Sequence, residues 1–321
     1  MIAAGRGGWF TRADVLAAGY SDSELRRRVR SGQWLRMSYN SYVEPRGVPA
    51  DEPSWERALR LHRLNIRMAL ERLGDVVVSH QSATVLHGLP QWGTDLAKAH
   101  FTRPAAGRDR TGRTVRVHRS PVADDEVVAV EGLPVTSVER AIVETTCTTS
   151  YEVGVVLSDA ALRLGSTTPN QLAAAVLRHR HWPGSPAARA AVRFADGLSE
   201  SVGESRLRVL MANHGLPAPE LQVEIRGNRG GLIGRVDFLL SGHLIVEFDG
   251  AMKYGGSADA VLAEKWREDR LREAGYGVVR VGWADLDRPQ LTADRLRRGL
   301  LRQANGTLDK QLLVGGRRSG V

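Results

Sequence analysis

Alternating apolar and polar positions in the last third of the chain predict a β-hairpin. In "VDFLLSGHLIVEFDG" (236–250), two apolar runs flank a Ser-Gly turn. A three-residue loop at 241–243 pairs Leu240 with Leu244, and the pairing continues outward along both strands. A two-residue loop would shift the register by one residue and mix apolar and charged side chains on each face. The three-residue loop is therefore favoured.

This register sorts the side chains of the hairpin onto two different faces, because successive side chains of a strand point to opposite sides. Asp237 lies opposite Glu247, and Arg235 lies opposite Asp249. These four residues share their face with Leu239 and Ile245. The other face is wholly apolar and is expected to be the buried one. It carries Val236, Phe238, Leu240, Leu244, Val246 and Phe248.

The segments around the hairpin complete an α-β-β-β-α-β pattern over 198–301. Apolar residues at helical spacing predict helices in "ESVGESRLRVLMANHGLP" and "DAVLAEKWREDRLREAG". Further strands are expected at "LQVEIRG" and "YGVVRVGW", and a last basic helix at "TADRLRRGLLRQ". The glycine-rich "RGNRGGLIGR" lacks the lysine and helix of a phosphate-binding loop and is interpreted as a hairpin loop. Residues 302–321 are expected to form a loose tail.

The first region, 1–48, has the order helix, turn, helix, hairpin that is typical of a winged helix-turn-helix. "TRADVLAAG" predicts a helix with Thr11 as its N-cap. "YSDSELRRRVRSG" predicts a second helix, with Ser21 and Glu24 as a capping box. "QWLRMSYNSYV" then predicts two short strands. Arginines of the second helix and the wing are candidate DNA contacts: Arg26, Arg27, Arg28, Arg30 and Arg36. The alternative is a solvated basic helix face.

The middle region, 49–197, predicts an α/β domain. A long amphipathic helix is expected at "SWERALRLHRLNIRMALERLG", followed by a strand at "DVVVSH" and a short helix at "QSATVLHGLP". Strands are expected at "TVRVHRS" and "EVVAVEGLPVTS", and helices at "VERAIVETT", "SYEVGVVLSDAALRLG" and "TPNQLAAAVLRHR". The segment "HWPGSPAARAA" is interpreted as a connector.

Charge favours a nucleic-acid partner. The 321 residues carry 45 Lys and Arg against 36 Asp and Glu, a net charge of +9, and basic proteins attract polyanions through counterion release. The alternative is that a high arginine content spreads positive charge over the whole surface. No signal peptide or run of eighteen apolar residues is present, so neither secretion nor a membrane span is expected. With one cysteine, Cys147, the chain forms no internal disulfide, and this favours the cytoplasm.

The acidic face of the hairpin is a candidate metal site. Like charges on adjacent strands repel, and a cation between Asp237 and Glu247 would relieve this repulsion. Carboxylates without histidine or cysteine suit Mg²⁺ or Mn²⁺. Glu204 on the preceding helix could complete the site, although it also fits a capping box with Ser201. The alternative for the strand acids is a solvated face bridged by Arg235 and Lys265.

The histidines show no such pattern along the sequence. None makes the i, i+4 pair with a glutamate that marks a helical zinc site. All are therefore interpreted as ordinary polar or core residues: His80, His87, His100, His118, His179 and His181.

The last third of the chain resembles the PD-(D/E)xK nuclease superfamily. The resemblance rests on "ESRLRVLMANHGLP", "GRVDFLL", "HLIVEFDG" and "EKWREDRLREAGYGVVRVGW", and the most similar branch is the Vsr-like (very-short-patch-repair) endonuclease domains. It implies a restriction-endonuclease-like fold that hydrolyses phosphodiesters with a divalent metal. Its metal ligands would be Asp237 and Glu247, with Asp249 beside them.

The same resemblance implies further roles and shows two departures. Glu204 would be the acid that supports the ligands. Asp249 stands where the superfamily often has its lysine, and Val236 where the signature has proline. Lys265 is the candidate for a relocated catalytic lysine, and Lys253 is the second.

The first two regions resemble the AbiEi-type antitoxins of type IV toxin–antitoxin systems. "FTRADVLAAGYSDSELRRRVRSGQWLRMSYNSYV" carries the resemblance to their winged start, and "VVSHQSATVLHGL" and "GLPVTSVERAIVETT" to the domain that follows. The resemblance implies a DNA-binding module and a cognate toxin or defence partner.

Taken together, the sequence predicts an α+β multidomain protein and leaves two functions open. The first is a Mg²⁺-dependent DNA endonuclease that acts in phage defence or DNA repair and is delivered to DNA by a winged helix. The second is an antitoxin-like transcriptional regulator whose nuclease fold is inactive.

Overall fold

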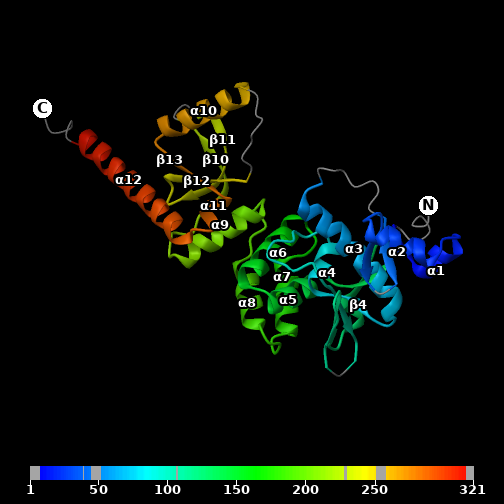
Figure 1. Cartoon of the computed structure of the whole chain (residues 1–321). Coiled ribbons are helices and arrows are strands. Elements are labelled where there is room, and N and C mark those ends of the chain that lie inside the picture. The colour runs from blue at the N-terminus through cyan, green and yellow to red at the C-terminus, as the bar shows by residue number, and fades with distance from the viewer. Residues whose placement is uncertain are drawn as a thin grey trace, which may run out of the picture. The chain divides into compact units, whose positions relative to one another are not determined.

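The chain folds into two compact units. The computed structural model shown in Figure 1 describes residues 8–38, 40–44, 52–105, 108–227, 230–250 and 258–315, with the backbone alone described for 258–261 and 305–315. Unit 1 comprises Met1–Leu157 and Thr167–Arg193, and unit 2 comprises Ser158–Ser166 and Phe194–Val321. The predicted domain boundaries stay predictions, and the first of them falls within 45–51, outside the described residues.

The start of unit 1 is a winged module with the expected helices and wing. Helices α1 (Arg12–Ala17) and α2 (Asp22–Arg30) begin at Thr11 and Ser21, and both N-caps form the two hydrogen bonds of a capping box. The sheet has the order β1-β3-β2. Its strands are β1 (Trp9–Thr11), β2 (Leu35–Ser38) and β3 (Ser41–Val43). Strand β1 adds a third strand to the hairpin that the sequence predicts.

An aromatic cluster holds the winged module together. The rings of Phe10 and Trp34 meet edge to face at 4.9 Å, and Tyr20 meets Trp34 in the same way at 5.6 Å. Trp9 lies on the other side of the sheet and packs with Met68 of α3 (Ser54–Leu73). The module therefore shares part of its core with the long helix that follows it.

The rest of unit 1 is built around a six-stranded mixed sheet with the order β6-β7-β5-β4-β9-β8. The strands are β4 (Val77–Val78), β5 (Ala99–Arg103), β6 (Arg110–Thr111), β7 (Val115–Arg119), β8 (Val127–Val130) and β9 (Leu133–Thr136). Strand β5 was not expected from the sequence, and it pairs parallel with β7 and antiparallel with β4.

Helices accompany this sheet along the chain. They are α4 (His80–Leu86), α5 (Val138–Thr148), α6 (Tyr151–Arg163), α7 (Pro169–Arg178) and α8 (Ser185–Phe194), together with the 3-10 turn η2 (Asp124–Glu126). The interpretation of "HWPGSPAARAA" as a connector is wrong, because α8 begins directly after Gly184. The helix buries Ala188 and Ala191, and Ala188 packs with Val143 of α5.

A buried ion network crosses the interior of unit 1. The Arg140 guanidinium is 1% exposed; its Nε donates to Glu144 at 2.8 Å and its Nη1 to Glu126 at 2.5 Å. His179 holds the other oxygen of Glu126 at 2.7 Å. Because an unpaired buried charge is costly, these groups depend on one another.

Unit 2 has the predicted element order α-β-β-β-α-β. Its sheet has the order β10-β11-β12-β13, with the first two pairs antiparallel and the last parallel. The elements are α9 (Val202–Asn213), β10 (Glu220–Arg226), β11 (Leu232–Leu240), β12 (Leu244–Asp249), α10 (Ala258–Glu273), β13 (Gly277–Gly282), α11 (Trp283–Leu286) and α12 (Pro289–Gly315).

Both faces of this sheet are covered by helices, as Figure 1 shows with α10 on one side and α9 and α12 on the other. Phe238 and Val246 pack toward α9 and α12, as the apolar face of the hairpin predicts. Val236 was expected on that face but packs in the cluster of Leu239. Leu239 and Ile245 lie on the face that also carries the acids, and they pack with Leu271 of α10. The expectation of a single buried face is therefore wrong.

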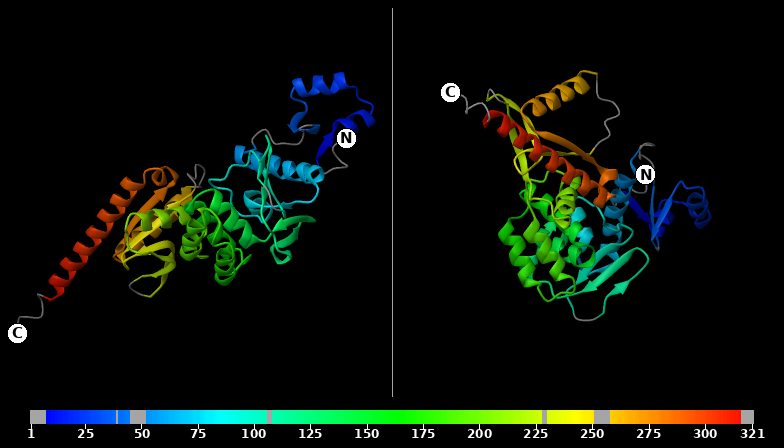
Figure 2. Two further views of the ribbon diagram at one scale, coloured as in Figure 1. Left: turned by 90° about the horizontal axis from the view of Figure 1, so that it is seen from below. Right: turned by 90° about the vertical axis from the view of Figure 1, so that its left-hand side faces the viewer.

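Helix α12 is longer than the sequence pattern suggests. It runs to Gly315, past the point where a loose tail was expected, and Figure 2 shows it as one continuous helix. The start of α12 contributes Ala293 and Leu296 to the core of unit 2. Residues 316–321 lie outside the described residues.

Candidate functional site

The acidic residues of the hairpin lie where its two strands stop pairing. The predicted register is confirmed at Leu240–Leu244 and Leu239–Ile245. Among the described residues the ladder ends one pair later, and the expected pair of Asp237 with Glu247 is not formed. The Asp237 carboxylate instead accepts the backbone N–H of Phe248 at 2.8 Å. A side-chain oxygen of Asp237 thus takes the place of a backbone carbonyl as the acceptor for the Phe248 N–H.

Glu204 joins these acids from the first turn of α9. It is 6% exposed, and Ser201 both caps the helix through its side chain and donates to Glu204 at 2.8 Å. The expected capping box is formed only in half, because the Glu204 carboxylate accepts the backbone N–H of Glu200 at 2.9 Å and not that of Ser201. Glu204 also accepts from the Gln222 amide at 3.0 Å. Burial raises the pKa of the Glu204 carboxyl, and the nearby Asp237 charge raises it further.

Gln222 reaches Glu204 because its backbone is irregular. Its φ is 53°, in the left-handed region, and the residue drops out of the ladder between Leu221 and Val223 of the edge strand β10. Non-glycine residues rarely adopt this conformation, so its presence beside three acids points to a function. The sequence analysis missed Gln222, and no sequence pattern marks it.

The surroundings of the two strand acids shift the pKa of both carboxyls upward. Burial raises the pKa of both Asp237 and Glu247. The Phe248 N–H opposes the shift of Asp237, and the Arg267 guanidinium opposes the shift of Glu247. Each acid also feels another carboxylate: Glu200 raises the pKa of Asp237, and Asp237 raises that of Glu247. The three carboxylates, Glu204 included, therefore form one electrostatic cluster.

The cation that neutralises Glu247 is Arg267 of α10. Its Nη2 donates to Glu247 Oε1, and its Nε donates to Glu264 at 3.2 Å. Arg280 of β13 lies 3.8 Å from the other Glu247 oxygen. Glu264, Arg267 and Leu271 follow helical spacing along the face of α10 that meets the sheet, and this phase could have identified Arg267.

The other predicted residues of this site are not brought to the acids. Lys265 is exposed, two residues away from the sheet-facing Arg267, and makes no hydrogen bond or ion pair with other described residues. Asp249 is exposed at the end of β12. The predicted register placed Arg235 opposite Asp249, but the ion pair of Arg235 is with Glu200 at 2.9 Å. Lys253 lies outside the described residues.

The donor set of the cluster fits a hard divalent cation. Asp237 and Glu247 offer partly buried carboxylate oxygens, which are the ligands that such a cation prefers. A bound cation would offset the cost of burying their charges. Arg267 now occupies one oxygen of Glu247. A metal ion would therefore have to share or displace this guanidinium.

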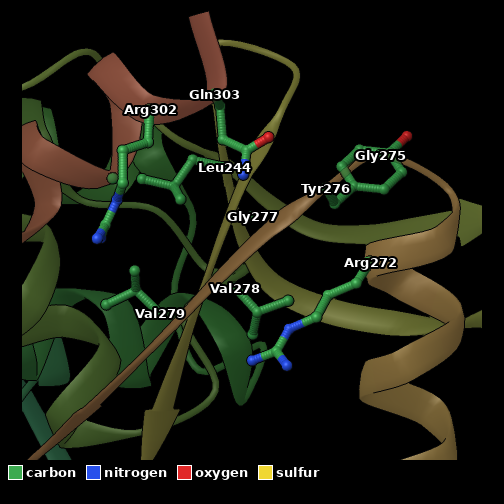
Figure 3. A pocket seen from close by; sticks show the side chains of 10 residues that line it. Leu244, Arg272, Gly275, Tyr276, Gly277, Val278, Val279, Arg302 and Gln303 are labelled. Carbon is green, nitrogen blue, oxygen red and sulfur yellow. The ribbon is translucent and has the colours of Figure 1, made fainter. Parts of the chain in front are cut away.

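A separate pocket of unit 2, shown in Figure 3, contains none of these acids. It has a volume of about 360 Å³ and lies where β12 and β13 begin, whereas Glu247 lies toward the end of β12. Arg272, Tyr276 and Arg302 line it. The pocket is thus distinct from the acid cluster.

The winged module presents most of its predicted DNA contacts to solvent. Arg26, Arg27, Arg30 and Arg36 are exposed. Arg28 differs, because its guanidinium lies over the rings of Tyr20 and Trp34 at 4.9 and 5.0 Å. Arg28 is therefore held by the aromatic cluster.

Three histidines of unit 1 come together, contrary to their interpretation as separate ordinary residues. His80, His100 and His118 are all buried, and one ring nitrogen of each lies within 4.8 Å of the others. Burial lowers the pKa of His80 well below its usual value, that of His100 to about 3 and that of His118 to about 4. All three imidazoles are thus neutral at pH 7.

Within the described residues, no helix is long and apolar enough to cross a membrane.

The fold and the comparisons together define the class of the N-terminal module. Residues 1–38 match a family described as a transcriptional regulator, AbiEi antitoxin. The chain is also 31% identical over 279 residues to uncharacterized proteins Rv2248 and MT2308 from two strains of Mycobacterium tuberculosis. The match covers 86% of this chain and 96% of each relative. The chain therefore belongs to the family of these mycobacterial proteins, and it begins with an antitoxin-like module.

Proposed function

We propose that this protein binds DNA through its winged module and cleaves it with a Mg²⁺-dependent nuclease site of PD-(D/E)xK type in unit 2. The observation that supports the nuclease is the convergence of Glu204, Asp237 and Glu247, all with raised pKa, at the open end of one hairpin. The α-β-β-β-α-β order of unit 2 is that of the superfamily that its sequence resembles.

In this proposal the acidic residues have two roles, metal binding and positioning of the site. Asp237 and Glu247 would hold the ion, with the exposed Asp249 as a further ligand. Bound there, Mg²⁺ would polarise a phosphoryl oxygen and lower the pKa of its water. Glu204, fixed by Ser201 and Gln222, would position the site.

Basic side chains would contribute on the DNA side. Arg267, once displaced from Glu247, would be available to a phosphate oxygen, the role for which Lys265 was predicted. In the winged module the exposed arginines of α2 would contact the DNA backbone. A cognate toxin or defence partner remains part of the proposal, through the antitoxin-like module.

The second candidate is a transcriptional regulator without catalysis. It is favoured by the Arg267–Glu247 ion pair, which fills the proposed metal position with a cation of the protein. It is also favoured by the exposed position of Lys265. Both candidates bind DNA, so binding alone does not separate them.

Cleavage of supercoiled plasmid in the presence and absence of Mg²⁺ separates the two candidates. The nuclease predicts cleavage by the wild type and its loss in Asp237→Asn, which keeps the acceptor for Phe248. Glu220→Gln on β10 is the matched control, because Glu220 is an exposed acid of the same sheet. Cleavage that persists in Asp237→Asn, or none in the wild type, favours the regulator.

DNA binding itself is tested by its salt dependence. Each phosphate contact contributes about 0.9 to the slope of log K against log salt, so Arg26→Ala and Arg30→Ala should each lower the slope by about that amount. Arg178→Ala removes one charge from α7, where it pairs with Asp125, and should leave the slope unchanged. Equal slopes in all variants would exclude α2 as the DNA contact.

A further inference from the structure

The histidine cluster of unit 1 is assembled from three separate elements. His80 begins α4, His100 lies in β5, and His118 lies in the neighbouring parallel strand β7. The register pairs Thr102 with His118, so the two strand histidines are offset by two residues along adjacent strands. His100 Nδ1 lies 3.0 Å from His118 Nε2. The pairing of β5 with β7 therefore sets the positions of His100 and His118 relative to each other.

Each ring is held through one nitrogen by a residue outside the cluster. His118 Nδ1 lies 3.1 Å from an Asp109 carboxylate oxygen, and His80 Nδ1 lies 3.0 Å from the Ser79 hydroxyl. His100 Nε2 lies 2.9 Å from the Gln81 amide nitrogen. Among the described residues, the second nitrogen of each ring has no hydrogen-bond partner outside the cluster. Histidine ligands of metals are arranged in this way, with the second nitrogen fixed by a carboxylate or another polar group.

Gln81, next to the cluster, has a buried side-chain oxygen that lacks a hydrogen bond among the described residues. Its amide nitrogen donates to the Asp95 carbonyl and to His100, but its Oε1 has no hydrogen-bond partner among the described residues. Gln81 is 5% exposed. If His100 used its Nδ1 lone pair for a metal, its proton would move to Nε2, and Oε1 of a rotated Gln81 amide would then accept a hydrogen bond from that Nε2–H.

We propose that His80, His100 and His118 form a binding site for a divalent transition-metal ion of the Zn²⁺ class. Imidazole nitrogen suits zinc, nickel, cobalt and copper rather than Mg²⁺. With Zn–N bonds of about 2.0–2.1 Å, two tetrahedral ligand nitrogens lie about 3.3 Å apart, close to the observed separation of His100 and His118. This site lies in unit 1 and does not depend on the proposed nuclease.

Loading the site requires one ring to turn. His80 and His118 are stacked at 3.7 Å with an interplanar angle of 13°. Because lone pairs lie in the ring planes, stacked rings cannot both point at one ion, so His80 must rotate out of the stack. A cavity of about 340 Å³ borders His100 and Gln81, with Lys98 and Arg116 also lining it. This cavity provides a path for the ion and room for a water or small anion as fourth ligand.

Titration of the untagged, metal-free chain with Co²⁺ tests the site, because nitrogen-ligated Co²⁺ of low coordination number absorbs visibly. We expect one such ion per chain, displaced by Zn²⁺. His100→Gln should abolish the absorption. His179→Gln, which removes an equally buried histidine bonded to Glu126, should retain it. Asp237→Asn should also retain it, which separates this site from the acid cluster.

Asp109→Asn provides a second test of the site, which is needed if a variant of a buried histidine does not fold. Half of the Asp109 side chain or slightly less is exposed, so the change should leave the fold intact. Loss of such a supporting carboxylate weakens metal binding about 10–100-fold. The proposal is overturned if the wild type shows no Co²⁺ absorption, if folded His100→Gln binds as the wild type does, or if Asp237→Asn removes the signal.

Discussion

Removing Arg140 should destabilise unit 1 more than any change of an exposed arginine. Arg140→Ala leaves Glu144, 2% exposed, without the arginine that pairs with it, and leaves Glu126 dependent on Arg178 and His179. Breaking a buried ion pair by removing one partner costs about 3–5 kcal/mol. In a unit of this size about 1 kcal/mol shifts Tm by roughly 2–4 °C, so we expect a fall of roughly 6–20 °C.

The assay combines calorimetry with hydrogen exchange of the amides of α5, which report on unit 1 alone. Arg67→Ala is the matched control. Its ion pair with Glu131 lies outside the network and is 42% and 41% exposed on its two sides, and such pairs contribute about 0–1 kcal/mol.

A double variant identifies the cause of the loss. If the cost comes from the uncompensated carboxylate, Arg140→Ala combined with Glu144→Gln should recover part of the stability lost in Arg140→Ala alone. A loss no greater than that of the control, or a double variant less stable than Arg140→Ala, would refute the reasoning.

Three further predictions concern single sites. Burial raises the pKa of Asp237 in the folded state, so the ionised carboxylate destabilises unit 2, and stability falls as pH rises from the ordinary value of 3.8 through the raised one. Asp237→Asn should therefore melt higher than the wild type at pH 7, by an amount that vanishes below about pH 3.8; an equal or lower Tm at pH 7 contradicts this. Gly203→Ala would place a Cβ 1.9 Å from a ring carbon of Phe248 and should lower the free energy of unfolding, measured in urea, by about 1–3 kcal/mol or more. Gly231→Ala, with open space around it, should leave that free energy unchanged. Similar losses in the two variants would show that the chain moves to relieve the contact. Burial raises the pKa of the Cys147 thiol to about 11, so iodoacetamide at pH 8 should modify it far more slowly in the native chain than in urea, and equal rates would show that the thiol is accessible.

Local patterns in the sequence were enough to predict the hairpin and its two strand acids. Strict alternation and a short loop leave one register, and that register held from Leu240–Leu244 to Phe238–Val246. The pattern could not show that the ladder ends there, because the Phe248 N–H is taken by a side chain and not by a backbone carbonyl.

Other features depend on tertiary structure and were missed. Which cation meets Glu247 is decided by the helical phase of α10, and a shift of two residues separates Lys265 from Arg267. The three histidines are 18 to 38 residues apart, and they meet through the parallel pairing of β7 with β5, a strand that was not predicted. Helix α8 was missed because Pro183 and Gly184 were taken as part of a longer connector, whereas they stand directly before its first residue.

The irregular strand β10 also affects whether copies of this protein can aggregate through their sheet edges. It is an edge strand of its sheet, and a regular edge offers unpaired backbone groups to any neighbouring chain. The left-handed Gln222 interrupts that edge, and the exposed Glu220, Glu224 and Arg226 place charges along it. A change such as Gln222→Val, which favours a regular extended strand, would loosen Glu204 and at the same time create a template for aggregation.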